Sequence, residues 1–478
     1  MKIKIAGFLL ALLTFVTGVQ VVLAQDMRQQ NSIALAKLCG FINKQDAAGM
    51  YALTNENFQK AIGQVNFENY ARYGIFAQGK VTDTVFVSLA EGVSAYKTTF
   101  SGAAFNVKIG ADKDGKIGTL FFKKIDTTTQ VRKEPLKSAN PMLTKADKTI
   151  DEAAREYLEK KGTVGVSIGV LQNGVMRTYT YGETEKGSGE MPGTHSVYEI
   201  GSITKTFTAT LLAWYVNTGK VLLNDPITKY LPDSVKMNEE LKGITLQMLS
   251  NHTSGLPRVP DNLMDGNANL LNPYKLYNRK KLFSYLKRCK LVSAPGTVAA
   301  YSNLGAGLLG TLLEVATKKP YEKMLDEIII TPLKLDATGI SLKNSEHAAQ
   351  LLPVYNENGE KTPRWDFDAL AGAGAVRSTS IDLLVYAQAN LDLNTSPRGK
   401  ALAMTQKITH EDEKMNIGLG WMLRKGLKYP VYWHNGGTYG SSSYIGFIPG
   451  KGAAVVVLSN CVQSVDEMAG KILNVLME

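Results

Sequence analysis

The sequence predicts an α+β protein in two parts: a small α+β domain, then a larger domain with a helix-flanked antiparallel sheet and an inserted α-rich region. With 478 residues, the chain is longer than one hydrophobic core usually organises. Strand-like sequence occurs at both ends of the larger part, at 164–181 and 432–459, with mostly helical sequence between. Residues 126–140 are polar, threonine-rich and without apolar periodicity, which indicates a linker.

The N-terminus is typical of an export signal. Lys2 and Lys4 precede a mostly apolar run over residues 5–23, and Val22 and Ala24 supply the small residues of a cleavage site. The rival interpretation is a retained membrane anchor, because the run is almost long enough to span a bilayer. Polar residues interrupt the apolar run, and small residues stand at its end, so cleavage after residue 24 is favoured. We therefore expect a periplasmic or secreted protein.

The composition limits the classes of binding partner that we expect for this protein. The net charge of +11 would attract an anionic cell envelope, although ordinary solubility explains it equally well. The basic residues are not gathered into a stripe interleaved with aromatics, so we expect no nucleic acid. The three cysteines and five histidines form no Cys-x-x-Cys, His-x-x-x-His or His-Glu-x-x-His pair, so no metal or cofactor is predicted. The expected partner is a small-molecule or peptide substrate.

Residues 25–125 are predicted to form the small domain. The sequence to about Tyr73 is helical in character, and strand-like alternation follows at 84–89, 104–109 and 117–122, with a hairpin turn at 112–115. Helices followed by a curved sheet resemble the cone-shaped domains related to nuclear transport factors, many of which only bind or assemble.

Residues 141–478 are predicted to form the larger domain. It opens with a helix over 144–161, for which Thr144 is a suitable N-cap. A hairpin follows, because Asn173-Gly174 between two alternating runs is the favoured two-residue turn. At the C-terminus we expect strands at 432–437, 443–448 and 453–459 and a closing helix over 465–476.

Ser202-Ile-Thr-Lys205 is a Ser-x-x-Lys motif. It precedes an apolar helix, whose free N–H groups favour an oxyanion, and Lys205 lies on the same helix face one turn later. A buried lysine there can lose its proton and activate the hydroxyl. Two other matches lack this context: Ser94 to Lys97 ends a strand-like run, and Ser284 to Lys287 lies in a lysine-rich, solvated helix.

Two further elements accompany this motif. In Tyr301-Ser-Asn303, a tyrosine near cations can exist partly as phenolate and shuttle protons, and an amide can hold a substrate carbonyl. In His434-Asn-Gly436-Gly437, the glycines would let a substrate backbone approach closely. The Gly437 N–H would be the second oxyanion donor beside that of Ser202.

These elements, in this order, resemble the class C β-lactamases and the related penicillin-binding D,D-peptidases, D-aminopeptidases and esterases. The spacings also fit, at 99 residues from Ser202 to Tyr301 and 133 from Tyr301 to His434. Further family-like segments occur at 245–256, 372–379 and 418–421. The resemblance covers about residues 140–478 and implies a β-lactamase-like fold.

The resemblance also implies residue roles. Ser202 would be the acylated nucleophile, Lys205 and Tyr301 the proton-transfer groups, and Asn303 a substrate-binding amide, with His434, Gly436 and Gly437 lining the substrate site. One departure matters, because β-lactamases of this class carry Lys-Thr-Gly where this chain has His434-Asn-Gly. We therefore expect an exported serine hydrolase of the peptidase or esterase type. The alternatives are a β-lactamase and a weakly catalytic or non-catalytic receptor for peptidoglycan or penicillin.

Overall fold

The computed structural model describes residues 25–90, 92–125, 136–266, 268–342, 345–412, 416–424 and 427–478. The predicted export signal and residues 126–135 of the predicted linker lie outside these ranges. The chain divides into two compact units, Met1–Thr127 and Thr128–Glu478.

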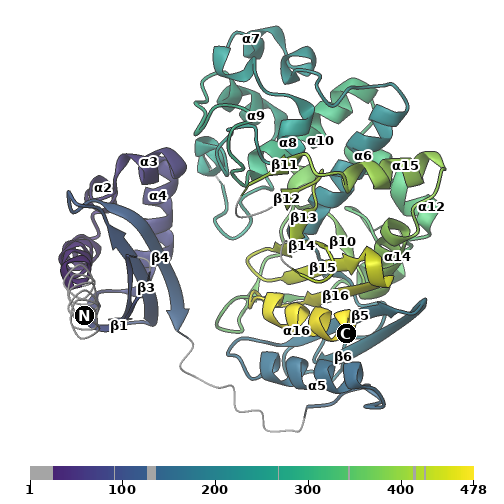
Figure 1. Ribbon diagram of the computed structural model, residues 1–478, viewed down its shortest axis with the longest axis horizontal. Coiled ribbons are helices and arrows are strands. Elements are labelled where there is room, and N and C mark those ends of the chain that lie inside the picture. The colour runs from purple at the N-terminus through teal and green to yellow at the C-terminus, as the bar shows by residue number, and fades with distance from the viewer. Residues whose placement is uncertain are drawn as a thin grey trace, which may run out of the picture. The chain divides into compact units, whose positions relative to one another are not determined.

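The smaller unit packs helices on one face of a four-stranded antiparallel sheet (Figure 1). Residues 25–44 are helical. They are followed by α2 (Ala47–Ala52), α3 (Glu56–Ala61), α4 (Gln64–Tyr70), the short turns Ala71–Ile75 and Phe76–Gln78, and the strands β1 (Val81–Ala90), β2 (Val93–Phe100), β3 (Ala104–Ala111) and β4 (Ile117–Ile125). The helices and the inward face of the sheet share one hydrophobic core.

Strand β2 is the element of this unit that the sequence pattern did not predict. Its inward face carries Ser94, Tyr96, Thr98 and Phe100, all buried, so polar and apolar residues share that face and the usual alternation is hidden. Ser94 therefore lies near the start of β2. The prediction that it ends a strand was wrong. The Ser94 hydroxyl is buried and accepts a hydrogen bond from Asn31 Nδ2 at 3.0 Å.

The larger unit is built on an eight-stranded antiparallel sheet in the order β11-β12-β13-β14-β15-β16-β5-β6. Its strands are β5 (Gly165–Gln172), β6 (Val175–Gly182), β11 (His410–Glu411), β12 (Asn416–Ile417), β13 (Met422–Arg424), β14 (Val431–Gly437), β15 (Ser442–Ile448) and β16 (Ala453–Ser459). The first strands of this unit pair with the last, since Ala454 lies opposite Leu171 and Ser459 opposite Val166. The predicted joining of both ends in one sheet is confirmed.

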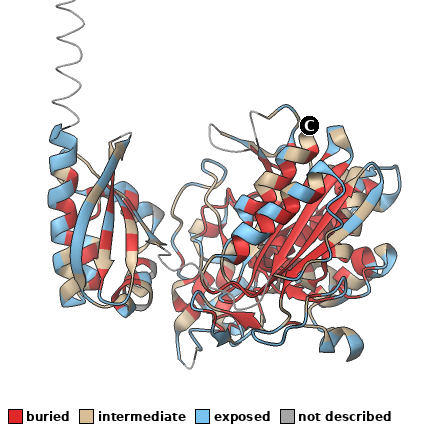
Figure 2. Ribbon diagram, turned by 90° about the horizontal axis from the view of Figure 1, so that it is seen from below, coloured by how far each residue is buried: buried red, intermediate tan, exposed pale blue. Residues whose placement is uncertain are grey.

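Helices cover both faces of this sheet (Figure 1). The helices α5 (Lys145–Leu158) and α16 (Asp466–Met477) pack on the face that includes Val455 and Val457. The opposite face, with Val456 and Leu458, packs against α6 (Thr204–Asn217) and α14 (Ser380–Leu391). This is why the central strands are apolar at nearly every position and appear almost wholly buried in Figure 2.

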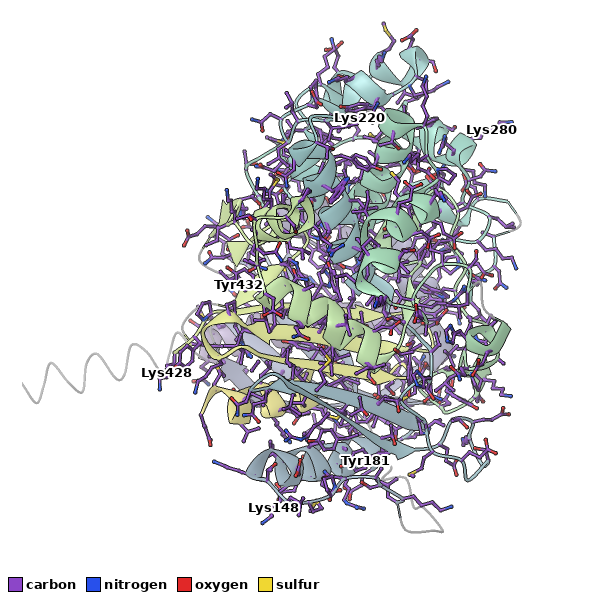
Figure 3. All side chains as sticks on the ribbon, turned by 90° about the vertical axis from the view of Figure 1, so that its right-hand side faces the viewer. Lys148, Tyr181, Lys220, Lys280, Lys428 and Tyr432 are labelled. Atoms are coloured by element: carbon purple, nitrogen blue, oxygen red, sulfur yellow. The ribbon has the colours of Figure 1, made fainter. Side chains whose placement is uncertain are left out.

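The predicted α-rich insertion lies between β6 and β11. Beyond α6 and α14, its helices are α7 (Asp233–Lys236), α8 (Leu246–Ser250), α9 (Arg279–Leu286), α10 (Asn303–Thr317), α11 (Tyr321–Leu325), α12 (Thr331–Leu333), α13 (Ser345–Ala349) and α15 (Pro397–Thr405). In Figure 3, Lys220 and Lys280 lie at this end of the unit, and Lys148 of α5 lies at the other. Within the described ranges, no helix is both long and apolar enough to cross a membrane.

Residues 136–140, the end of the predicted linker, belong structurally to the larger unit. Leu136 packs against its core, and Ser138 forms an isolated bridge with Tyr181 of β6. Asn140 Nδ2 donates to the Tyr181 hydroxyl at 2.8 Å and to the Asp147 carbonyl at 2.7 Å. The folded part of this unit therefore begins before residue 141.

Candidate active site

Ser202 lies in a 3₁₀ turn, Gly201–Ile203, that runs directly into α6. Strand β14 passes so close to this turn that neither Gly201 nor Gly436 has room for a side chain. A Cβ on Gly436 would lie 2.1 Å from the Ile200 carbonyl oxygen and 2.9 Å from the Ser202 nitrogen, and one on Gly201 would lie 2.7 Å from the Gly437 nitrogen. The backbone nitrogens of Ser202 and Gly437 are thus held at the same junction, as two oxyanion donors require.

The two glycines of β14 differ in what they do. Gly436 is needed for the contact between β14 and the Ser202 turn, so our expectation that it makes room for substrate was wrong. Gly437 is open, because a Cβ there would meet only the Ser441 carbonyl oxygen, at 3.5 Å. Gly437 therefore has free space beside its Cα, as the prediction of a substrate backbone there requires.

Lys205 projects from the first turn of α6 into a buried position with 3% of its surface exposed. Its Nζ lies 2.8 Å from Ser202 Oγ, 2.9 Å from Asn303 Oδ1 and 2.7 Å from the Ala373 carbonyl oxygen. Burial, helped by Arg258, holds the pKa of Lys205 well below its usual value.

The partners of Lys205 suit a neutral amine. Two of them, Asn303 Oδ1 and the Ala373 carbonyl, can only accept a hydrogen bond, so they take the two N–H groups. The third partner, the Ser202 hydroxyl, can donate. Once the amine has lost its proton, its lone pair faces the Ser202 hydroxyl, which is the arrangement of a general base and a nucleophile.

Tyr301 completes the group around the Ser202 hydroxyl. Burial raises the pKa of Tyr301 to about 12, opposed by a hydrogen bond with Ser202 and by the Arg258 charge. Its phenol is consequently protonated at neutral pH, and the phenolate that the sequence analysis expected is not the resting form. The His252 ring lies 4.4 Å from the Tyr301 ring, and its Nδ1 accepts from the Ser302 amide at 3.3 Å, so His252 positions the Tyr301 loop.

Asn303 is the first residue of α10, whose N-cap is Ser302. Its side chain bridges two parts of the site, because Oδ1 accepts from Lys205 and Nδ2 donates to the Tyr274 hydroxyl at 3.2 Å. In this structure Asn303 positions Lys205, and its second amide hydrogen is the one left for a substrate.

His434 lies on β14 with 1% of its surface exposed. Its Nδ1 donates to the Asn435 carbonyl oxygen at 2.6 Å, and its buried Nε2 has no partner within the described part of the chain. Burial is the main cause that lowers the pKa of His434 to about 3, and the hydrogen bond to the Asn435 carbonyl oxygen opposes it. We had expected an unperturbed histidine that gains charge just below neutral pH, and this was wrong because the ring is enclosed.

A buried acid that no sequence motif indicated lies beside the site: Glu199, three residues before Ser202. Its carboxylate accepts from the Trp365 amide at 2.5 Å and from the Thr438 hydroxyl at 2.9 Å. It thereby ties the residue after Gly437 to a loop that carries Trp365. A single charged residue in the apolar run 197–200 was the signal that could have revealed it.

The two competing Ser-x-x-Lys matches are not assembled in the same way. Ser94 is buried on the inward face of β2, while Lys97 is exposed. Ser284 and Lys287 are both exposed at α9. Of the three motifs, Ser202 to Lys205 is the one in which the structure brings the hydroxyl and the amine together.

The fold and the Ser202–Lys205 pair define a class of protein, the serine hydrolases that use a lysine beside the nucleophile. The model of the Beta-lactamase family matches residues 150–476, and the chain belongs to this family of serine hydrolases. A β-lactamase of Pseudomonas fluorescens is 28% identical over 65% of this chain and 92% of its own length. The D-alanyl-D-alanine-carboxypeptidase/endopeptidase AmpH of Escherichia coli K12 is 29% identical over 70% of this chain and 89% of its own.

Solved structures show the same fold. A class C β-lactamase superposes with a TM-score of 0.61 at 24% identity, covering 70% of this chain and 98% of its own. A β-lactamase/D-alanine carboxypeptidase from Pseudomonas syringae gives a TM-score of 0.61 at 24% identity, covering 69% of this chain and 99% of its own. The expected β-lactamase-like fold is confirmed.

Proposed function

We propose that this protein is an exported peptidase or esterase of the penicillin-recognising type, which cleaves an amide or ester bond through an acyl-enzyme on Ser202. The observation that carries the proposal is the buried Lys205 amine 2.8 Å from the Ser202 hydroxyl. Its depressed pKa gives a base beside a nucleophile at neutral pH.

The distances around Ser202 support an acylation step in which Lys205 is the base. Lys205 Nζ takes the Ser202 proton as Oγ bonds to the substrate carbonyl carbon, and the displaced electron pair moves to the carbonyl oxygen. The N–H groups of Ser202 and Gly437 then hold the oxyanion. When the scissile C–N or C–O bond breaks, the leaving group takes the Tyr301 proton, and the Lys205 ammonium returns a proton to Tyr301. Water hydrolyses the acyl ester by the same proton path and restores Ser202.

Two observations favour a peptidase or esterase over a β-lactamase. The neutral His434 stands where β-lactamases of the resembling class have a permanently charged lysine, so this position offers a hydrogen-bond acceptor and no charge. Relatives with similar coverage include both AmpH and a penicillin-binding protein 4 of Amycolatopsis lactamdurans, which is 27% identical over 62% of this chain. The P. fluorescens β-lactamase keeps β-lactam hydrolysis as the second candidate.

Export is the part of the proposal that rests on sequence alone. Residues 1–24 have the positive charge, the apolar run and the small residues before a cleavage site that are typical of a signal peptide. A periplasmic or secreted location also suits the proposed chemistry, because peptides of the cell wall lie outside the cytoplasm. Mass spectrometry of the protein from cell fractions tests this, and a chain that keeps residues 1–24 in the cytoplasm would contradict it.

The activity is tested with covalent probes and a substrate panel. A fluorophosphonate or penicillin should label the unaltered protein, Ser94→Ala and Ser284→Ala, and should not label Ser202→Ala. The panel contains nitrocefin, short acyl esters and peptides that begin or end in D-alanine, and we expect turnover of esters or peptides. An adduct on another serine would refute the assignment. Stoichiometric labelling without turnover would support the receptor alternative.

A further inference from the structure

We propose that Arg258 binds a carboxylate of the substrate beside Ser202, so that the preferred acyl donors of this site carry a free carboxylate. The inference rests on the acyl-enzyme function proposed above and names the residue that would make this site prefer a carboxylate-bearing acyl donor to its neutral counterpart. No sequence motif pointed to Arg258, which follows the family-like segment 245–256.

The structure places the Arg258 guanidinium at the site. Its Cζ lies 5.0 Å from the centre of the Tyr301 ring, and Lys205 Nζ lies 4.9 Å from the centre of the same ring. The charge of Arg258 acts on the pKa values of Lys205, Tyr301, His252 and Tyr274. One exposed side chain thus lies within electrostatic reach of most of the polar groups that surround the nucleophile.

The backbone of Arg258 is anchored while its side chain is free. The carbonyl oxygen of Arg258 accepts from the Asn303 amide at 2.8 Å and from the Leu304 amide at 3.2 Å, which fixes the residue to the start of α10. The side chain is exposed. Across the described residues, no carboxylate or carbonyl oxygen is bonded to its guanidinium. The guanidinium therefore keeps its N–H groups available for a carboxylate, on a backbone that is held at the start of α10.

The other cationic groups near the site are neutral or occupied. Lys205 serves as the base, and His434 is neutral. Arg364 donates to the Leu351 and Leu352 carbonyl oxygens. Arg377 donates to the Ile340 and Trp365 carbonyl oxygens and to Asp366. Arg258 therefore supplies the permanent positive charge that His434 does not, and an anionic substrate group would bind on the Tyr301 side of the nucleophile.

The test compares acylation by two matched reagents in the full chain. The second-order rate constants for acylation of Ser202 by benzylpenicillin and by its methyl ester are measured by intact-protein mass spectrometry. The quantity of interest is the ratio of acid to ester. A change in the reactivity of Lys205 or Tyr301 alters both rates and cancels in this ratio. Acylation needs no turnover, so the ratio is also measurable in a protein that penicillin acylates once and that does not hydrolyse the product.

In Arg258→Gln the acid-to-ester ratio should fall about 10- to 100-fold, the value of a hydrogen-bonded charge pair. Arg258→Lys should recover part of the preference for the acid, because lysine keeps the positive charge but cannot form a bidentate hydrogen-bond pair with a carboxylate. The matched control is Arg177→Gln on β6, an exposed arginine that tests net charge alone and should leave the ratio unchanged. In the unaltered protein added salt should weaken the preference, because the guanidinium is exposed.

The outcomes separate this inference from the function on which it depends. An acid-to-ester ratio in Arg258→Gln that matches the unaltered protein would overturn the role of Arg258 and leave the acyl-enzyme on Ser202 intact. An equal fall in Arg177→Gln would also overturn it, since general attraction would then explain the preference. If neither reagent acylates Ser202 in the unaltered protein while a fluorophosphonate still labels it, this inference fails and the acyl-enzyme function stands. Loss of the fluorophosphonate labelling as well would refute the function itself.

Discussion

His434 and Asn435 are joined by a hydrogen bond of 2.6 Å, in which the ring Nδ1–H donates to the Asn435 carbonyl oxygen. This bond settles the tautomer, because the proton on Nδ1 leaves Nε2 as an acceptor with a free lone pair. The ring that replaces a lysine in the related β-lactamases therefore accepts a hydrogen bond instead of offering a charge.

The first prediction concerns substrate preference and pH. The pKa of His434 is about 3 and arginine stays charged, so the preference for a carboxylate-bearing substrate over its neutral counterpart should be constant between about pH 5 and 9. The kcat/KM ratio of the two substrates against pH checks this. A step near pH 6.5, lost in His434→Asn, would show that His434 gains charge and recognises the carboxylate. His434→Lys should raise the preference by about 1–3 kcal/mol.

The second prediction concerns stability in acid. His434 has a lowered pKa when folded, so below its unfolded value of about 6.5 the unfolded chain binds a proton that the folded chain excludes. Stability should therefore fall with pH between about 6.5 and 3, by roughly 1.4 kcal/mol per pH unit for this residue. Denaturant unfolding at several pH values should show a shallower loss in His434→Asn. Identical slopes in the two proteins would mean that His434 is protonated in the folded state.

The third prediction concerns Tyr301. Its raised pKa keeps the phenol protonated, so it acts by donating a proton to the leaving group. Tyr301→Phe should slow acylation by a poor leaving group, such as a peptide amine, by about 10²–10⁴. The loss should be smaller for an activated ester, whose leaving group needs no proton. Equal losses for amide and activated ester in single-turnover experiments would assign Tyr301 to activation of Ser202.

The fourth prediction separates Gly436 from Gly437. A methyl group on Gly436 would overlap the Ile200 carbonyl oxygen, so Gly436→Ala should push β14 away from the Ser202 turn. We expect a loss of about 1–3 kcal/mol in stability and strongly reduced labelling of Ser202. Gly437→Ala, with its nearest contact at 3.5 Å, should keep the melting temperature and affect only bulky substrates. Comparable melting temperatures for the two variants would contradict this division.

The fifth prediction concerns where the larger unit begins. A protein starting at Leu136 should fold and hydrolyse a generic ester without the smaller unit. One starting at residue 141 loses the packing of Leu136 and the two hydrogen bonds that Asn140 Nδ2 donates, and should be less stable by about 1–3 kcal/mol. Thermal unfolding and ester turnover compare the two proteins. A folded but inactive protein from Leu136 would show that the smaller unit is needed for activity.

Several features could be predicted from the sequence because they depend on local pattern. Asn173 and Gly174 adopt the positive φ angles of 53° and 73° that a two-residue hairpin needs, and Thr144 caps α5 as expected. The three C-terminal strands lie within a residue of their predicted limits. Ser202 was distinguishable from Ser94 and Ser284 by the apolar helix that follows it.

The tertiary structure decided whatever depends on groups from distant parts of the chain. Whether Lys205 is a base, Tyr301 a phenol or His434 a neutral acceptor follows from burial and neighbouring charge, and a sequence motif contains neither. Arg258 became visible only when the fold placed it beside Tyr301. The sequence by itself determined which residues could react. The packing of α6, α10 and β14 around one point determined their protonation, because pKa is a property of the surroundings.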